Sequence, residues 1–478
     1  MSTSATQPPR VLDRQVVSFW GLVSQSLAGM APTCDVVAFM TAGAAFALVA
    51  LPLSYLAAFV LMFIEVNTIY HLSKDRPSAG GYYSYVSMGL GPKAATLTGF
   101  MVLFYQVLSV AGVPVYVGGV FLPGLAAEMH IALPSYFWML MVTLFIGVPW
   151  GLSVSGIRPS IKVLTLTSLT EIVFLIGASA WIIARVHPSV PLRPFELAST
   201  GVRGLAMGMI FAITSFIGVG SHAPLGEEVK GIRTQRGRLV GKAAIVSLTL
   251  VGAALVLSAY ALTVGWGMDS MKTFATSPAP GVTVFLHYLG PIGAVALVVL
   301  ALNSAMADDI ALLTSSSRVL YAIARDNLVN TGFAQVNGHN APAKSVTLLA
   351  IVAFVVAIST GLWLGPSNAF NMLTTAVLFG LVTAHTLMNV SLMRLFREDQ
   401  SHHRHILQHV VLPVIATGLF WWVLYESVWP IVWPISLSAV LWIVFGAPVL
   451  WYIVKRAPHL TALQGRRLGL VDEVDDEF

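Results

Sequence analysis

The chain has 478 residues, of which 56% are hydrophobic and 10% are charged. Soluble domains carry about 25% charged residues, so this composition excludes an ordinary soluble protein and indicates an integral membrane protein. The mean hydropathy of +0.80 agrees with that class. The formal net charge of +5 raises nucleic-acid binding as a further candidate function.

Apolar segments long enough to cross a bilayer recur along the whole chain. Polar side chains within most of them fit helices that bury a face against one another rather than against lipid. The sequence therefore predicts an all-α integral membrane protein with twelve transmembrane helices. The predicted spans are 19–45, 49–72, 95–122, 135–154, 161–185, 204–228, 239–266, 286–317, 345–363, 368–394, 410–428 and 432–454.

The basic residues test this count, because cytoplasmic loops carry an excess of Lys and Arg. With the N-terminus inside, only Arg185, Arg193, Arg203 and Lys272 of the 26 basic residues fall in outside loops, which leaves 22 inside. We therefore expect a multi-pass protein of the plasma membrane with both termini cytoplasmic. The basic charge then reflects topology, and nucleic acid is not an expected partner. No removable signal peptide precedes the first span, which is expected to act as the targeting signal.

The first span is interrupted near its middle by Gly29 and Pro32, residues that weaken or break a helix. A break at membrane depth is tolerated only where it is buried in protein or lines a polar cavity. The free N–H groups of the second half-helix would then form a site for an anionic group such as a carboxylate. A simple proline kink is the alternative interpretation of this span alone.

The sixth span carries a corresponding interruption at Gly218, Gly220 and Pro224, with Ser221 and His222 beside it. Spans one and six each begin a set of five. Interrupted spans at corresponding positions of two halves are typical of transporters built from inverted repeats, with the substrate at the midplane between the breaks. The predicted organisation is a cytoplasmic tail over 1–18, a first repeat over 19–185, an inverted second repeat over 204–394, two further spans over 410–454 and a cytoplasmic tail over 455–478.

Three motifs follow one another along the chain. They are P-S-A-G-G-Y-Y-S-Y over 77–85 with G-L-G-P over 89–92, S-F-I-G over 215–218 with G-E-E-V-K over 226–230, and S-R-V-L-Y-A-I-A-R-D over 317–326 with F-A at 333–334 and A-P at 341–342. In this order they resemble the amino acid–polyamine–organocation (APC) family of permeases. The resemblance covers roughly 17–394. It implies the LeuT-type 5+5 inverted-repeat fold with broken helices one and six, alternating access, and transport of amino acids or related amines.

The chain departs from the family pattern in three places. The first break reads G-M-A-P-T over 29–33 rather than a glycine-rich G-S/T-G run. Gly220 stands where several members carry an acid, and Thr170 and Glu171 stand where some proton-coupled members carry a lysine. The resemblance therefore leaves both the substrate and the coupling ion open.

The resemblance and the physics of the breaks together predict a substrate site. Backbone N–H groups around Ala31 to Cys34 are expected to hold a carboxylate, and carbonyls around Phe216 to Gly218 an amine. Asp35 is a candidate partner for a substrate amine or a coupling cation, or alternatively an acid stabilised by the half-helix dipole. The predicted substrate-binding residues are Gly29, Met30, Ala31, Pro32, Thr33, Cys34, Asp35, Phe211, Thr214, Ser215, Phe216, Gly218, Ser221 and His222.

Several members of this set also have plainer interpretations. Thr214 stands where some relatives place an aromatic gate, so gating by that residue is not expected. Phe211 and Phe216 are candidate substitutes for the gate, with ordinary packing as the alternative. His222 titrates near neutrality and could tune activity with pH, although a lone histidine is more often simply hydrogen-bonded.

Acids buried in a membrane are costly and usually functional. Glu171, in mid-span five, suits a proton carrier because burial penalises its charged form, whereas a polar contact between helices is the alternative. Asp308 and Asp309 are adjacent in span eight, so at most one is expected to reach a central cavity. Thr314 and Ser315 follow them; hydroxyls on span eight bind the ion in sodium-coupled relatives, and bonds back to the helix are the alternative.

The sequence thus predicts a secondary active permease that imports an amino acid or related amine, driven by protons. Sodium coupling, exchange of two amines or polyamines, and a non-transporting nutrient sensor of the same fold are the alternatives. No phosphate loop, nucleophile constellation or zinc-ligand spacing occurs in the sequence, so neither an enzyme, a cofactor nor a metal site is expected.

Overall fold

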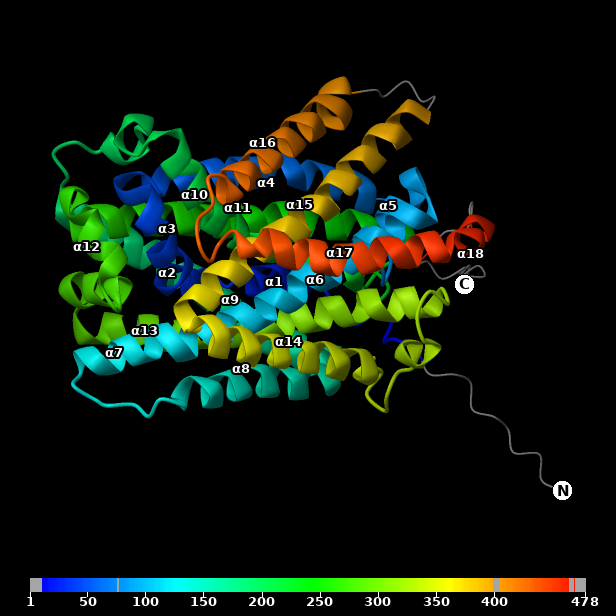
Figure 1. Cartoon of the computed structure of the whole chain (residues 1–478), viewed down its shortest axis with the longest axis horizontal. Helices are drawn as coiled ribbons and strands as arrows, with labels where there is room; N and C mark the ends of the chain where they lie inside the picture. The colour runs from blue at the N-terminus through cyan, green and yellow to red at the C-terminus, as the bar shows by residue number, and fades with distance from the viewer. Residues whose placement is uncertain (1–10, 75–76, 399–404, 464–467, 469–478) are drawn as a thin grey trace.

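A computed structural model describes residues 11–74, 77–398, 405–463 and 468 (Figure 1). Parts of the two predicted tails, 1–10, 464–467 and 469–478, lie outside the described residues. The described part of the chain is helical, and its only β-type pairing is an isolated parallel bridge between Val17 and Val229. The predicted all-α class is therefore confirmed.

The helices up to the middle of the chain are α1 (Phe19–Gly29), α2 (Pro32–Val37), α3 (Phe39–Ala47), α4 (Leu51–Ser73), α5 (Tyr82–Leu90), α6 (Pro92–Tyr116), α7 (Leu122–Glu128), α8 (Phe137–Val154) and α9 (Ile157–Val186). The remaining helices are α10 (Gly201–Thr214), α11 (Arg233–Trp266), α12 (Met271–Thr276), α13 (Pro280–Arg325), α14 (Ala343–Leu364), α15 (Pro366–Glu398), α16 (Leu412–Val428), α17 (Leu437–Lys455) and α18 (Ala457–Ala462).

Eleven stretches of the described residues are long enough and apolar enough to cross a membrane, and they correspond to predicted spans two to twelve. The predicted first span is divided among α1, α2 and α3, none of which has the length of a span by itself. The third of these pieces, α3, continues into α4 to give the first of the eleven, Phe39–Ser73. The count of twelve spans and the inverted relation of the two halves stay predictions.

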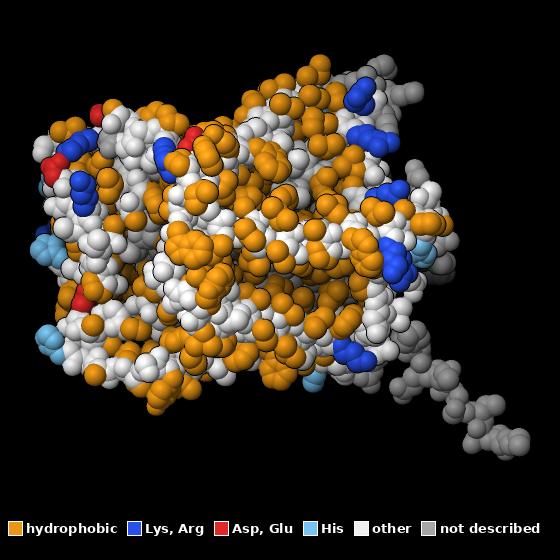
Figure 2. Space-filling model, viewed as in Figure 1, with side chains coloured by type: hydrophobic (Ala, Val, Ile, Leu, Met, Phe, Trp, Pro, Cys, Tyr) orange, Lys and Arg blue, Asp and Glu red, His pale blue; other side chains and the backbone are white. Residues whose placement is uncertain are grey.

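The surface seen in Figure 2 is hydrophobic or uncharged across its middle, with Lys, Arg, Asp and Glu side chains gathered towards the two ends. Large apolar side chains are freely exposed on the membrane-spanning helices, for example Ile292 of α13 at 86% and Leu166 of α9 at 75%. Monomeric soluble proteins rarely expose contiguous apolar surface of this kind, so the band is the lipid-facing surface.

The broken segments lie in the interior. The α1 helix packs on α9, α11 and α13, and α2 packs on α13, so these short helices are enclosed by longer ones. Every residue of α2, and every residue of α1 from Gly21 onward, is buried. A chain break here has no access to lipid, which is the condition for irregular backbone at membrane depth.

Candidate functional site

The first break falls between α1 and α2. Met30 caps α1, and Ala31 adopts a left-handed conformation with φ 40° and ψ 55° before Pro32 begins α2. A left-handed conformation is uncommon for a residue with a side chain, and Pro32 supplies no N–H to continue the preceding helix. The segment is therefore broken rather than kinked.

The second break follows α10. Two 3₁₀ turns, Ile217–Gly220 and Ala223–Leu225, take the place of the second half-helix. Gly218 lies directly against Gly29, since a Cβ atom added to Gly218 would overlap the Gly29 backbone. The two breaks thus meet through backbone contact in the interior.

Hydroxyl groups tie the two breaks together. Ser26 Oγ of α1 donates to the carbonyl of Val219 at 3.1 Å, and Ser221 Oγ donates to the carbonyl of Gln25 at 3.1 Å. Ser247 of α11 in turn donates to Ser26 Oγ at 2.8 Å. Ser221, which was predicted as a substrate ligand, therefore has its hydroxyl committed to joining the breaks.

Asp35 and Ser215, both predicted site residues, are brought together across the breaks. Ser215 Oγ donates to Oδ1 of Asp35, and the hydroxyl of Tyr55 in α4 lies 3.4 Å from Ser215 Oγ. Asp35 is fully buried; the Tyr55 hydroxyl lies beside its carboxyl group, and its Oδ2 meets no hydrogen-bond partner within normal geometry among the described groups. A buried carboxylate oxygen without a donor can accept a bond from a ligand cation or amine.

Four buried acids surround the Cys34 thiol. Asp35, Glu171, Asp308 and Asp309 are each at most 2% exposed, and all four act electrostatically on Cys34. Asp308 and Asp309 are thus both buried close to the first break. Among the described groups, Asp308 meets Ser109 of α6, whose hydroxyl lies 3.5 Å from Asp308 Oδ2, whereas neither carboxyl oxygen of Asp309 has a hydrogen-bond partner.

Glu171 lies at the junction of α9, α2 and α13. Asn303 Nδ2 donates to Glu171 Oε1 at 2.8 Å, and Thr33 and Ser304 lie beside the carboxyl group. Glu171 Oε2 has no partner among the described groups. The first turn of α2, where a substrate carboxylate was expected, is therefore faced by a carboxyl group of the protein itself.

The hydroxyls of Thr314 and Ser315 make contacts between helices. Thr314 Oγ1 lies 3.4 Å from Ser153 Oγ of α8, and Ser315 Oγ accepts from Gln106 Nε2 of α6 at 3.1 Å. By contrast, the next residue, Ser316, donates back to the Leu312 carbonyl of its own helix. These contacts hold α13 against α6 and α8.

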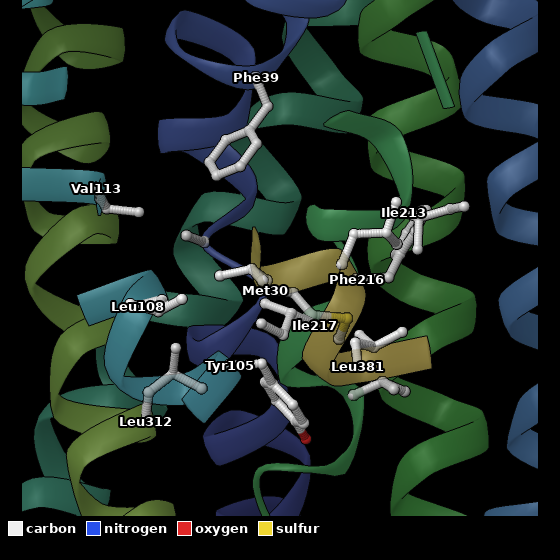
Figure 3. Packing of buried hydrophobic residues seen from close by; sticks show 14 of the residues in the cluster. Met30, Phe39, Tyr105, Leu108, Val113, Ile213, Phe216, Ile217, Leu312 and Leu381 are labelled. Carbon is white, nitrogen blue, oxygen red and sulfur yellow. The ribbon is translucent and has the colours of Figure 1, made fainter. Parts of the chain in front are cut away.

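A small cavity of about 10 Å³, room for about one water molecule, lies beside the breaks, between α3, α6, α10 and α15. Figure 3 shows Phe39 on one side of Met30, with Leu108 and Val113 on another. The lining residues are Phe39, Leu108, Ser109, Gly112, Val113, Thr214, Phe370, Thr374 and Val377. Thr214 is the only predicted site residue among them. Most of the lining residues come from predicted spans three and ten. The sequence gives no signal for them beyond isolated small and hydroxyl residues in otherwise apolar helices.

Phe211, Phe216 and His222 contribute packing and structural bonds. Phe211 stacks on Phe46 with ring centroids 5.9 Å apart, and Phe216 packs near Phe59. His222 Nε2 donates to the carbonyl of Val240 at 2.9 Å. All three predicted residues are fully buried and none lines the cavity, and their roles at a substrate site stay predictions.

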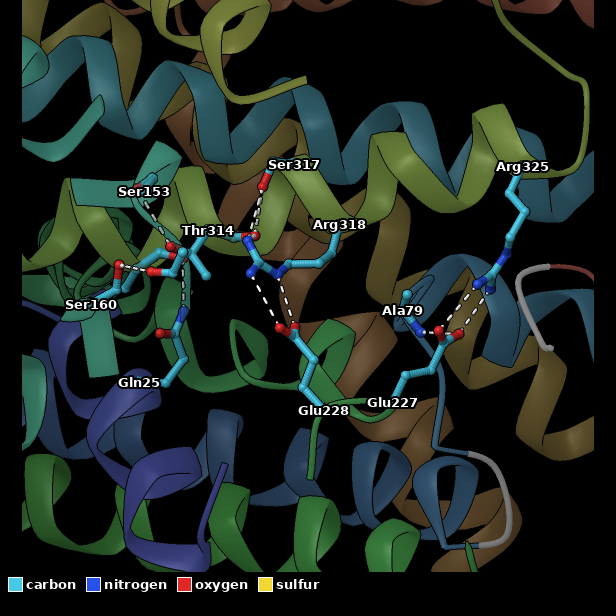
Figure 4. Close-up of polar contacts among 12 residues, drawn as sticks. Gln25, Ala79, Ser153, Ser160, Glu227, Glu228, Thr314, Ser317, Arg318 and Arg325 are labelled. Carbon is cyan, nitrogen blue, oxygen red and sulfur yellow. Dashed lines mark hydrogen bonds and ion pairs between the residues drawn. The ribbon is translucent and has the colours of Figure 1, made fainter. Parts of the chain in front are cut away.

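Two ion pairs lie at the end of the segment that follows the second break (Figure 4). Glu228 binds Arg318 at 3.0 Å and Glu227 binds Arg325 at 2.8 Å, so both partners come from α13. Glu227 also accepts from the N–H of Ala79 at 3.0 Å. The three motifs that carry the family resemblance therefore converge in one cluster.

Comparison with known proteins agrees with this architecture. The model of the family described as amino acid permease matches residues 21–455. The chain is similar to the branched-chain amino acid permease BcaP of Lactococcus lactis subsp. cremoris (strain MG1363), with 25% identity over 322 residues, 63% of this chain and 67% of the relative. It is also similar to the low-affinity putrescine importer PlaP of Escherichia coli (strain K12), with 22% identity over 435 residues, 87% of this chain and 90% of the relative.

Among solved structures, that of MhsT in complex with L-phenylalanine matches with a TM-score of 0.59 at 14% identity. The match covers 88% of this chain and 100% of that chain. At this level of identity the similarity establishes a shared fold.

Proposed function

Because the chain belongs to the amino acid permease family, we propose that it is a secondary active transporter that moves an amino acid or related amine by alternating access. The observation that carries this proposal is the meeting of two broken segments at Gly29 and Gly218, beside a small cavity. Broken segments at the midplane expose backbone groups and helix ends to a ligand, and rocking of the helices around that point alternates access.

The substrate is proposed to present an amino group to Asp35. The free Oδ2 of Asp35 and the three other buried acids around Cys34 favour a cation at this position. The names of the relatives support this reading, since branched-chain amino acids and putrescine have an amino group in common. The carbonyl of Phe216 accepts one backbone bond, from Val219, and keeps a lone pair for the amine, whereas that of Gly218 already accepts from the Ser221 N–H and from Ser26 Oγ.

The proposed coupling ion is a proton carried by Glu171. Because its Oε2 is free and its carboxyl group lies beside Thr33, gain or loss of a proton by Glu171 changes the charge that faces the first turn of α2. Sodium at Thr314 and Ser315 is the second candidate, supported by the position of these hydroxyls one to two turns after Asp308 in α13. For sodium to bind, the present contacts with Ser153 and Gln106 would have to be exchanged for contacts with the ion.

The proposed placement is in the plasma membrane with both termini cytoplasmic, and with repeats over 19–185 and 204–394. Val16 and Val17 donate to the carbonyl of Glu228, and Lys230 donates to that of Val17. These bonds place the segment before α1 and the end of span six at the same end of the molecule. The basic residues of the three family motifs, Lys230, Arg318 and Arg325, lie at that end, which fits a cytoplasmic side under the positive-inside rule.

Transport by the purified protein in liposomes tests the function. The assay uses a panel of labelled amino acids and amines, an acid-outside gradient and no sodium. Accumulation above equilibrium that collapses with an uncoupler is the expected result. Uptake only with sodium, or only against internal amine, would replace the proton with the corresponding alternative. Binding without uptake under every condition would overturn transport in favour of a sensor.

A further inference from the structure

A further buried acid lies in the membrane-spanning region, away from Asp35, Glu171, Asp308 and Asp309. Glu65 of α4 is fully buried and accepts from His385 Nδ1 at 2.8 Å and from Asn389 Nδ2 at 2.9 Å, both on α15. Thr68 donates to Asn389 Oδ1 at 2.6 Å, which orients the amide so that its NH₂ group faces Glu65. Both carboxyl oxygens of Glu65 therefore have donors, the arrangement that suits an ionised carboxylate.

This cluster crosses a boundary between two groups of helices. The α4 helix packs mainly on α10 and α11, whereas α15 packs mainly on α5 and α6, and direct packing between α4 and α15 is sparse. Glu65, His385 and Asn389 form the polar part of that sparse contact. A change in this cluster would thus act on how α4 and α15 hold together.

The cluster also reaches the second break. The ring of Tyr82 in α5 packs edge-on to His385, with centroids 5.3 Å apart. The Tyr82 hydroxyl lies directly against Gly220, where it would overlap any added Cβ atom, and it has no hydrogen-bond partner among the described groups. Tyr82 therefore connects the Glu65–His385 pair to the broken segment after α10.

The surroundings leave His385 as the counter-charge for Glu65. The nearby titratable groups from α5 and α6 are the phenols Tyr82, Tyr85 and Tyr105. The α16 helix contributes Thr417 to Asn389 and Phe420 to the His385 ring. Among the described residues, no Lys, Arg or second acid contacts the pair. A buried charge in hydrocarbon is costly unless it is paired.

We propose that Glu65 and His385 form a proton-binding site separate from Glu171, which holds α4 against α15 when protonated and makes transport depend on pH. One proton added to His385 Nε2, with Nδ1–H still donating to Glu65, gives a neutral pair of opposite charges. Loss of that proton leaves one uncompensated negative charge between the helices, which favours hydration and parting of the contact. The inference rests on the transport function proposed above.

Proton binding is tested without any transport. Solid-state ¹⁵N NMR of the full-length protein in lipid, from about pH 5 to pH 8, reports on the ring nitrogens of His385, and His385→Gln assigns their signals. We expect both nitrogens to be protonated at the acid end and one at the alkaline end. Glu65→Gln should remove the doubly protonated form. His385 signals that stay the same over the whole range would overturn the site.

Control of transport is tested by exchange of labelled leucine and labelled putrescine at equal internal and external pH. The wild type should show a step in rate over the same range, and Glu65→Gln and His385→Gln should each lose it. The double variant should lose no more, because the two residues act as one unit. Glu426→Gln, a partly exposed acid of α16, should keep the step. If the Glu65 and His385 variants keep the step in exchange rate that the wild type shows, pH control by this pair is overturned. If the wild type exchanges neither substrate, the transport function is overturned, and the NMR result alone decides the proton site.

Discussion

Gly29 and Gly218 touch through their backbones, at the point where the break after α1 meets the break after α10. A Cβ atom on Gly29 would lie 3.1 Å from the Gly218 Cα, and one on Gly218 would overlap the Gly29 carbonyl group. The contact depends on the absence of both side chains. It brings the free backbone groups of the two segments within reach of a single small ligand.

Gly218→Ala is expected to abolish transport and to lower stability by about 1–3 kcal/mol, because the methyl group must push the breaks apart. Thermal unfolding in detergent and liposome uptake are the measurements. Gly418→Ala is the matched control, since a Cβ atom on Gly418 meets nothing within 4 Å. Wild-type uptake by Gly218→Ala would contradict a tight contact between the breaks.

Glu171→Gln is expected to remove proton-driven accumulation while leaving exchange of substrate intact. The amide keeps the shape that fits Asn303 and Thr33 but cannot take up and release a proton. Uptake with and without a pH gradient, compared with exchange at equal pH, separates the two activities. Glu128→Gln, at the exposed end of α7, should accumulate substrate as the wild type does. Unchanged proton-driven uptake in Glu171→Gln would remove Glu171 from the coupling role.

Arg318→Gln is expected to cost about 3–5 kcal/mol of stability at neutral pH, because it leaves Glu228 as an unpaired buried carboxylate. Asp269→Asn is the control, since it breaks an ion pair with Arg193 in which Asp269 is 83% exposed, and should change stability little. Equal melting temperatures for Arg318→Gln and the wild type would show that the buried pair makes no net contribution.

The cost of Arg318→Gln should shrink as the pH falls. Burial raises the pKa of Glu228, and the Arg318 guanidinium offsets part of that rise, so the variant should have a still higher pKa. A raised folded-state pKa means that stability is fully present below the pKa of the unfolded chain and is lost as the pH rises through the folded one. Melting temperatures measured over a series of acid to neutral buffers check the sign. A cost that is constant with pH would contradict it.

Cys34, the only cysteine, is expected to react slowly with a small thiol reagent and more slowly still when substrate is present. It is fully buried next to Asp35, which is proposed to hold the substrate amine. Mass spectrometry of the labelled protein measures the rate. In a Cys34→Ser background, Glu128→Cys at an exposed site should react at a rate that substrate does not alter. Labelling of Cys34 that substrate fails to slow would place the thiol away from the transport path.

Local sequence chemistry was enough to locate both breaks. Gly29, Pro32 and Gly218 carry a direct backbone cost in a helix, so their effect is visible without knowledge of any partner. The same local chemistry could not predict that Glu228 pairs with Arg318. The two residues are 90 positions apart, and nearer basic residues in the loop after span six offered an equally good match by charge.

The residues that line the cavity could not be predicted from the sequence either. Gly112 and Thr374 come from spans three and ten, where an apolar helix with a few small residues looks the same whether it faces lipid, a neighbour or a cavity. The close approach of Glu171 to Thr33 and the pairing of Glu65 with His385 depend likewise on how helices are arranged, which residue periodicity does not encode.

Backbone hydrogen bonds between Val17 and the 228–230 segment join the start of α1 to the end of span six, so the two segments form one unit. Motion at this end of one segment is therefore transmitted to the other through these backbone bonds and through the hydroxyls of Ser26 and Ser221. If this end of the molecule opens during transport, the segment before α1 and the end of span six must move together, or the backbone bonds between them must break.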